Sequence, residues 1–138
     1  MKILVQTIYM SDALRWTTSK ESDVSRELHA LILEHRVEII GPIRQELLSG
    51  LRDNNQFDKL EKHLEAFPDI ALEAADYVTA ANFFNKCRAN GIQGSNTDFL
   101  ICAVAVRREI AIYTTDMDFQ QYIKHLPIVL HETRNFDS

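Results

Sequence analysis

The stretch NTDFLICAVAVRREIAIYTTDMDF, residues 96–119, decides the fold. Residues 99–106 are apolar at nearly every position, which predicts a central helix that is buried on all sides. Residues 110–113 form a short run rich in branched side chains and predict a buried strand. Residues 114–119 then turn from the end of that strand into a short helix. Aspartates stand at both ends of this unit, at Asp98 in the first turn of the long helix and at Asp116 and Asp118 just after the strand.

The same alternation of short strands and longer helices continues on both sides of this stretch. We expect further strands at residues 1–5, 37–40 and 128–130, and helices up to Trp16, over 22–35, from Pro42, from about 60 to 68, and over 71–88. Strands that feed helices through short turns imply right-handed crossovers and a parallel sheet covered on both faces. The predicted fold is therefore α/β, with three α/β/α layers around a central parallel sheet.

Length and composition limit what kind of protein this is. The chain has 138 residues, 46% hydrophobic and 25% charged, which predicts one globular domain over residues 1–138. No apolar stretch approaches the roughly 20 residues that span a bilayer, and we expect a cytoplasmic protein without a membrane partner. Cys87 and Cys102 lack metal-ligand spacing and are expected to be reduced, buried thiols. The net charge of −5 argues against a large surface that grips nucleic acid, so any such contact must be local.

The acids share one expected position in this fold. Functional groups in parallel sheets gather at the carboxyl ends of the strands. Asp116 follows a strand directly, Asp98 begins a helix beside the sheet, and Glu46 lies about one turn into the helix after the second strand. Several carboxylates in one pocket repel each other, and a hard cation such as Mg²⁺ stabilises them. Such a metal centre activates water for phosphodiester hydrolysis.

Each acid also has a purely structural interpretation. Asp98 with Ser95 fits the spacing of a capping box, and Asp116 or Asp118 can cap the short helix that contains Phe119. Glu46 can be one more surface glutamate on an amphipathic helix. The periodicity alone leaves both interpretations open.

The chain resembles the PIN-domain family, and within it the VapC-type toxins of bacterial toxin–antitoxin pairs. The resemblance covers nearly the full length and rests on residues 3–5, on Glu46–Gly50, on Gly91-Ile92 ahead of residues 96–103, and on residues 114–119. It implies a PIN-like fold and an Mg²⁺- or Mn²⁺-dependent endoribonuclease with an RNA substrate, an antitoxin partner and a homodimeric assembly. It also implies that Glu46, Asp98 and Asp116 bind the metal, that Asp118 is an auxiliary acid, and that Thr115 supplies a hydroxyl beside the site.

The first motif departs from the family pattern. Where the family has an aspartate followed by small polar residues, this chain has Gln6, Thr7 and Ile8. Gln6 offers a neutral oxygen to the site, and the loss of one anion should weaken the binding of a dication. Asp12 is more than a helical turn away and does not replace it. Two hypotheses follow. The first is an active metal-dependent ribonuclease with Gln6 and Thr7 lining its site. The second is a catalytically weakened or inactive member that acts by binding, either by dimerising or by taking up an antitoxin or another partner in an apolar groove between the Pro42 and Gln56 helices.

Overall fold

A three-stranded parallel sheet forms the centre of the computed structural model, which describes residues 1–6 and 23–134. The strands are β1 (Ile3–Val5), β2 (Val37–Glu38) and β3 (Ala111–Tyr113), in the order β2-β1-β3. Ile3 pairs with both Val37 and Ala111, so the three strands run in register. Because the strands are parallel, their carboxyl ends meet at one edge of the sheet.

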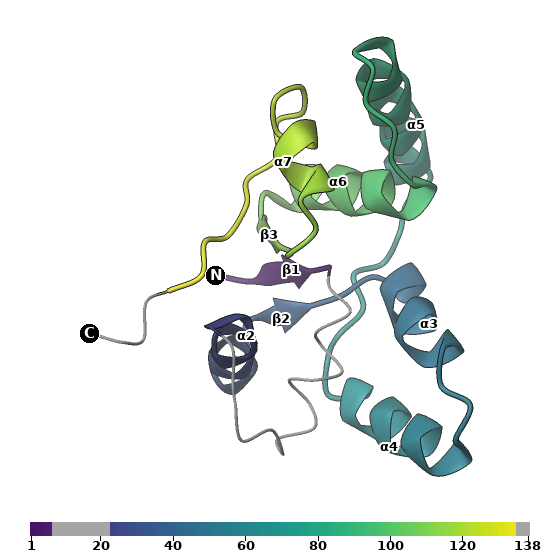
Figure 1. Ribbon diagram of the computed structural model, residues 1–138, viewed down its shortest axis with the longest axis vertical. Coiled ribbons are helices and arrows are strands. Elements are labelled where there is room, and N and C mark those ends of the chain that lie inside the picture. Colours follow the sequence, from purple (N-terminus) through teal and green to yellow (C-terminus); the bar gives the residue numbers. More distant parts are fainter. Residues whose placement is uncertain (7–22, 135–138) are drawn as a thin grey trace.

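Helices surround this sheet in the described part of the chain. They are α2 (Asp23–Leu33), α3 (Gly41–Ser49), α4 (Asn54–Leu64), α5 (Ala74–Ala89), α6 (Asn96–Arg108) and α7 (Asp118–Tyr122). Figure 1 shows α5, α6 and α7 gathered beyond β3, and α2, α3 and α4 on the side of β2. The fold is a three-layer α/β/α arrangement, as the sequence predicts.

The core is built from the strands and from α6. Ile3, Leu4 and Val5 are almost completely buried, as is Ile112 in β3. Residues 101–105 of α6 are buried as well, which confirms the predicted central helix. A helix that is apolar all round must be covered on every side, and α5 and β3 both pack against α6.

The sequence signals for helix ends are visible in the structure. Pro42 lies in the first turn of α3, where its missing N–H costs little. Asp53 caps α4 by accepting hydrogen bonds from the backbone of Asn55 and Gln56. Gly91 has a φ of 78°, the left-handed conformation expected just after α5. These local rules place the loop that enters α6.

Several predicted bounds need correction. Residues 128–130 do not form a strand, because only one parallel bridge joins Leu130 to Ile112 there. Pro127, just before this segment, has no N–H to donate to a ladder. Ile128 and Leu130 still pack on the core while Val129 is 63% exposed, so the segment lies against the sheet without pairing along its length. The strand predicted for 37–40 shortens to two residues, and Ile39 instead bridges to Asp69. Helices α2 and α5 are shorter than expected, whereas α4 begins earlier than predicted, at Asn54, and ends at Leu64. The helix predicted up to Trp16 lies outside the described residues.

The expectations for the cysteines and for membrane-spanning segments can also be compared with the structure. Both cysteines, Cys87 and Cys102, are free and buried, as predicted. Within the described ranges, no helix is both long and apolar enough to cross a membrane.

Candidate metal centre

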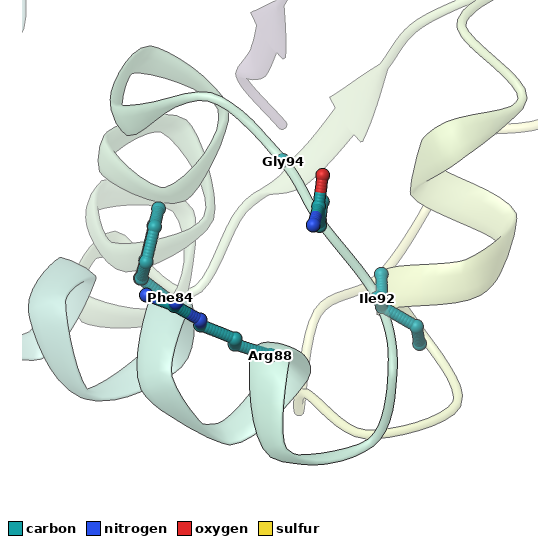
Figure 2. A pocket seen from close by; sticks show the side chains of 5 residues that line it. Phe84, Arg88, Ile92 and Gly94 are labelled. Atoms are coloured by element: carbon teal, nitrogen blue, oxygen red, sulfur yellow. The ribbon is translucent and has the colours of Figure 1, made fainter.

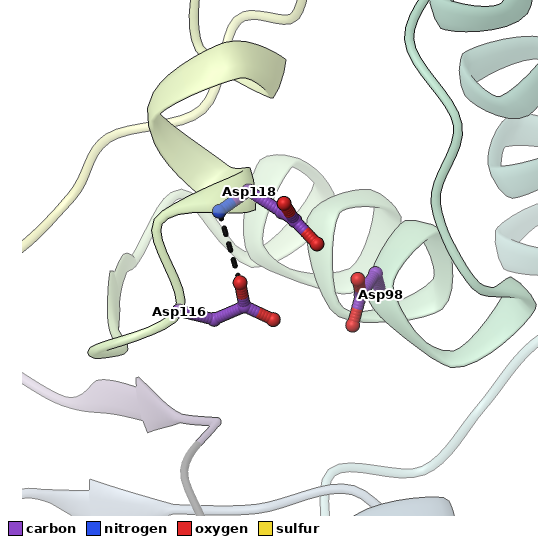
Figure 3. Close-up of side chains that lie close together, drawn as sticks. All are labelled: Asp98, Asp116 and Asp118. Atoms are coloured by element: carbon purple, nitrogen blue, oxygen red, sulfur yellow. Dashed lines mark hydrogen bonds between the residues drawn. The ribbon is translucent and has the colours of Figure 1, made fainter.

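Three aspartates come together at the carboxyl edge of the sheet. One carboxylate oxygen from each of Asp98, Asp116 and Asp118 lies within 4.8 Å of the other two. Figure 3 shows Asp98 pointing from α6 towards the other two side chains, of which Asp116 comes from the turn after β3 and Asp118 from the start of α7. Asp98 is buried, with 8% of its surface exposed, whereas Asp118 lies open to solvent. A buried carboxylate therefore forms the floor of a small acidic site.

Two neighbours fix Asp98 in place. Its backbone N–H donates to the hydroxyl of Ser95, the N-cap of α6, at 3.1 Å. Its Oδ2 accepts a hydrogen bond from the hydroxyl of Tyr122 at 2.8 Å. Burial raises the pKa of Asp98, and the nearby Asp116 and Asp118 raise it further against the opposing hydrogen bonds from Tyr122 and Ser95. Ser95 therefore caps α6 as the predicted capping box requires, but the return bond from the Asp98 side chain is not seen and that side chain points into the acidic group.

The turn between β3 and α7 positions the other two acids. The backbone N–H of Asp116 donates to the hydroxyl of Thr114 at 3.0 Å. The backbone N–H of Asp118 in turn donates to Oδ1 of Asp116 at 2.9 Å. Hydrogen bonds of this kind, from a backbone N–H to a side chain two residues earlier, are typical of tight turns. Asp116 thus helps to start α7 and still has its second carboxylate oxygen available.

Gln6 lies beside this turn, at the end of β1. Its backbone N–H donates to the carbonyl of Tyr113 at 2.9 Å, which extends the pairing of β1 with β3 by one residue. Its side-chain Oε1 accepts a hydrogen bond from the Thr114 hydroxyl at 2.5 Å. The predicted proximity of Gln6 to the acids is therefore observed, through Thr114.

No cation balances the acidic group within the part of the chain that is described. No lysine, arginine or histidine there forms an ion pair with Asp98, Asp116 or Asp118. Three mutually repelling carboxylates, one of them buried, need positive charge to be stable when ionised. Hard oxygen ligands of this type suit Mg²⁺ or Mn²⁺. The donor set present therefore fits a divalent metal ion.

The remaining predicted site residues are placed differently. Glu46 lies on α3 with its side chain exposed and is outside the group of three aspartates. Thr115 is half-buried, and it is Thr114 that makes the hydrogen bonds. Thr7 lies outside the described residues. Sequence reasoning missed Tyr122 and Thr114, although a threonine two residues before an aspartate is a recognised turn signal.

A hollow of about 180 Å³ lies close to the acids, between the end of α5 and the loop that enters α6. Its lining residues are Phe84, Arg88, Ile92, Gln93 and Gly94 (Figure 2). A β-carbon at Gly94 would collide with the hydroxyl of Tyr122 and with the ring of Phe99. Gly94 thus allows the loop to pack against the tyrosine that holds Asp98. The hollow and the acidic group share this contact.

Comparisons with known proteins identify relatives in sequence and in fold. No model of a protein family matches the chain. The chain is 33% identical over 97 residues to the VapC ribonuclease Mb1587 of Mycobacterium bovis and to the ribonuclease VapC11 of Mycobacterium tuberculosis. In each case the match covers 67% of this chain and 72% of the relative.

Solved structures show the same fold. The crystal structure of FitAcB from Neisseria gonorrhoeae has a TM-score of 0.71 at 16% identity, and that of VapBC2 from Rickettsia felis, bound to a promoter DNA fragment, has 0.69 at 17%. Each match covers 95% of this chain and 98% of the other. The likeness in sequence to the mycobacterial proteins extends over two thirds of the chain, and on that ground the chain belongs to the VapC ribonuclease family.

Proposed function

We propose that this protein is a metal-dependent endoribonuclease of the VapC toxin type, formed by a single PIN-like domain. The observation that supports the proposal most strongly is the group of three aspartates without a cation partner among the described residues. The curated relatives are named ribonucleases, and the same activity is the simplest use for such a site.

The three acids have different roles in the proposed site. Asp98 and Asp116 would bind Mg²⁺ or Mn²⁺ directly, and Asp118 would serve as an auxiliary acid at the exposed side. When bound, the metal would lower the pKa of a water molecule and neutralise charge on the scissile phosphate. Tyr122 and Asp118 contribute N–H or O–H donors that hold two of the carboxylates in one orientation. Such second-layer hydrogen bonds are commonly needed to fix metal ligands.

Glu46 has a secondary place in this proposal. It lies on α3, which follows the carboxyl end of β2, and in this proposal it acts from outside the group of three aspartates. Because its side chain is exposed and outside the group of three, we expect Glu46→Gln to weaken RNA cleavage less than Asp98→Asn does.

The hollow beside the acids is a suitable place for part of the RNA. Phe84 offers an aromatic face for base stacking, and Arg88 offers a cation for a phosphate at the rim. Reversing the charge with Arg88→Glu should weaken RNA binding, measured by fluorescence anisotropy. Lys86→Glu is the matched control, because Lys86 is an exposed cation on the same helix that does not line the hollow. Equal losses in both variants would argue against the hollow as an RNA contact.

The partners in the proposal are an antitoxin protein and a second copy of the chain. The structural neighbour from Rickettsia felis is described as VapBC2 bound to promoter DNA, which is consistent with a partnered toxin. Co-expression with a candidate antitoxin of the VapB type, followed by size-exclusion chromatography, tests for the complex, and the same chromatography of the chain alone tests for the homodimer.

The alternative is a catalytically weakened or inactive protein that acts by binding a partner, and the neutral Gln6 favours it. The deciding experiment compares RNA cleavage with Mg²⁺ or Mn²⁺ by the native chain, by Gln6→Asp and by Asp98→Asn. Cleavage by the native chain that is lost in Asp98→Asn supports the nuclease. An inert native chain whose Gln6→Asp variant cleaves supports the binding protein, and equal activity in all three would rule out the proposed site.

A further inference from the structure

Gln6 is connected to the acidic group by a series of hydrogen bonds. Thr114 donates its hydroxyl proton to Oε1 of Gln6 at 2.5 Å and accepts the backbone N–H of Asp116 at 3.0 Å. Asp116 then accepts the backbone N–H of Asp118 through Oδ1 at 2.9 Å. The series therefore runs from the end of β1 to the start of α7 and passes through one of the three clustered carboxylates.

The direction of each bond follows from the atoms involved. A hydroxyl has one proton to donate and lone pairs to accept with. Because the Asp116 N–H occupies a lone pair of Thr114, the hydroxyl proton is left for an acceptor. Gln6 Oε1 is that acceptor, and the main-chain bond from Gln6 to Tyr113 holds the residue beside Thr114. The bonding thus requires an acceptor oxygen at position 6, and it does not require a charge.

We propose that Gln6 is a positioning residue for Asp116 and not a ligand of the metal. Its oxygen orients the Thr114 hydroxyl, and the hydroxyl holds the backbone of Asp116 so that its carboxylate faces Asp98 and Asp118. This inference rests on the proposed function, because it assigns those carboxylates to a metal. It explains how a neutral amide at the end of β1 leaves the rest of the site correctly built.

The two roles for Gln6 differ in how its loss combines with the loss of Thr114. A positioning residue acts through Thr114, so removing both has the same effect as removing either one. A ligand acts on the metal directly, so its loss would add to that of Thr114. Double-mutant cycles separate these cases, since residues in one hydrogen-bond network are not additive.

The first test measures Mn²⁺ affinity by isothermal titration calorimetry for Gln6→Leu, Thr114→Val and the double variant. We expect each single change to weaken Mn²⁺ binding roughly fivefold, the size of one lost hydrogen bond. The double variant should also lose roughly fivefold. Gln6→Glu and Thr114→Ser keep the bonding atoms, and neither should lower the affinity. A double variant that loses the product of the two single effects, or single variants without effect, would overturn the proposal.

The second test needs no metal and therefore separates this inference from the proposed function. Amide hydrogen exchange, followed by NMR in the metal-free protein, reports the bond between Asp116 N–H and Thr114. Exchange at Asp116 should be faster in Gln6→Leu and in Thr114→Val, and unchanged in Gln6→Glu. If the native chain bound no Mn²⁺, the metal centre would fail while these exchange rates still decided the hydrogen-bond series. Unchanged exchange in Gln6→Leu would overturn the positioning role even in a chain that binds Mn²⁺.

Discussion

Two buried acids of this protein, Glu27 and Asp98, have opposite surroundings. Glu27 on α2 is completely buried and contacts His131 Nε2 at 2.8 Å and Arg134 Nε at 2.9 Å. Burial alone would raise the pKa of Glu27, but the bonds from Arg134 and His131 outweigh it and the pKa is lowered. Asp98 instead accepts a hydrogen bond from the neutral hydroxyl of Tyr122 and lies near Asp116 and Asp118. Burial raises its pKa. The fold thus neutralises one buried acid, while the other has no cation partner among residues 1–6 and 23–134.

Asp76 behaves like Glu27. It is 2% exposed, and the Arg107 guanidinium donates to both of its oxygens, at 2.7 and 2.9 Å. Although burial works against ionisation, these bonds hold the pKa of Asp76 below its usual range. Acids that join elements of the fold therefore have an arginine partner. The group around Asp98 lacks one in the described residues, which is the arrangement expected where a metal ion supplies the charge.

Among changes to these buried acids, Asp98→Asn should have the largest effect, and that effect should be on RNA cleavage. Losing a metal ligand should reduce RNA cleavage at least about 100-fold, more than the loss of a supporting hydrogen bond. The free energy of unfolding of the metal-free protein should not fall, because the change removes a buried charge for which the described part of the chain supplies no cation partner. Urea denaturation beside a cleavage assay measures both. A large loss of stability would place Asp98 among the structural acids.

Asp76→Asn should give the reverse result. It leaves the guanidinium of Arg107 without its buried partner, and we expect the free energy of unfolding to fall by about 2 kcal/mol, given that Arg107 is partly exposed. Mn²⁺ affinity per folded molecule, measured by calorimetry, should not change. If the Asp76→Asn variant were as stable as the native chain, the contrast between arginine-paired structural acids and Asp98 would be contradicted.

Glu27→Gln tests the pH dependence of the paired acid. A lowered pKa stabilises the fold above the group's ordinary value of 4.5, and this contribution is lost as the pH falls through the pKa of the folded state. We therefore expect Glu27→Gln to lower the free energy of unfolding by about 1.5 kcal/mol at pH 7. Denaturation curves at several pH values should show the difference shrinking below pH 4.5. A difference that grows on acidification would contradict this sign.

The smallest effect should come from Tyr122→Phe. The change removes the hydroxyl that donates to Asp98 and keeps the ring that packs against Phe99 and Phe119. Mn²⁺ affinity should fall about fivefold, the size of one hydrogen bond. Tyr113→Phe is the control, because its hydroxyl bonds Thr133 away from the three acids. Equal losses of Mn²⁺ affinity in both variants would show that the Tyr122 hydroxyl has no specific role in holding Asp98.

The sequence predicts that the three aspartates lie close together, because their positions depend on local rules. Asp116 and Asp118 share one turn after β3, and Asp98 begins the helix that packs on that strand. The hydroxyls of Tyr122 and Thr114 were not predicted as parts of the site. Tyr122 lies 24 residues from Asp98, and only the packing of α7 against α6 brings the two together. The exposed position of Glu46 likewise depends on the orientation of α3, which apolar periodicity defines only coarsely.

The segment at residues 128–130 shows a second limit of the sequence. Its branched residues predict a strand, but a strand needs a partner that pairs along several residues, and here only Ile112 pairs with Leu130. Local propensity cannot report how much of a sheet edge is available.

The central claim is that the acidic group of Asp98, Asp116 and Asp118 holds one divalent cation, with Asp98 and Asp116 as its direct ligands. Calorimetric titration of Mn²⁺ into the native chain, Asp98→Asn and Asp76→Asn tests it most directly. The account predicts saturable binding of one ion to the native chain and to Asp76→Asn under conditions where both are folded, and no measurable binding to Asp98→Asn. Equal binding by all three, or none by the native chain, would contradict it.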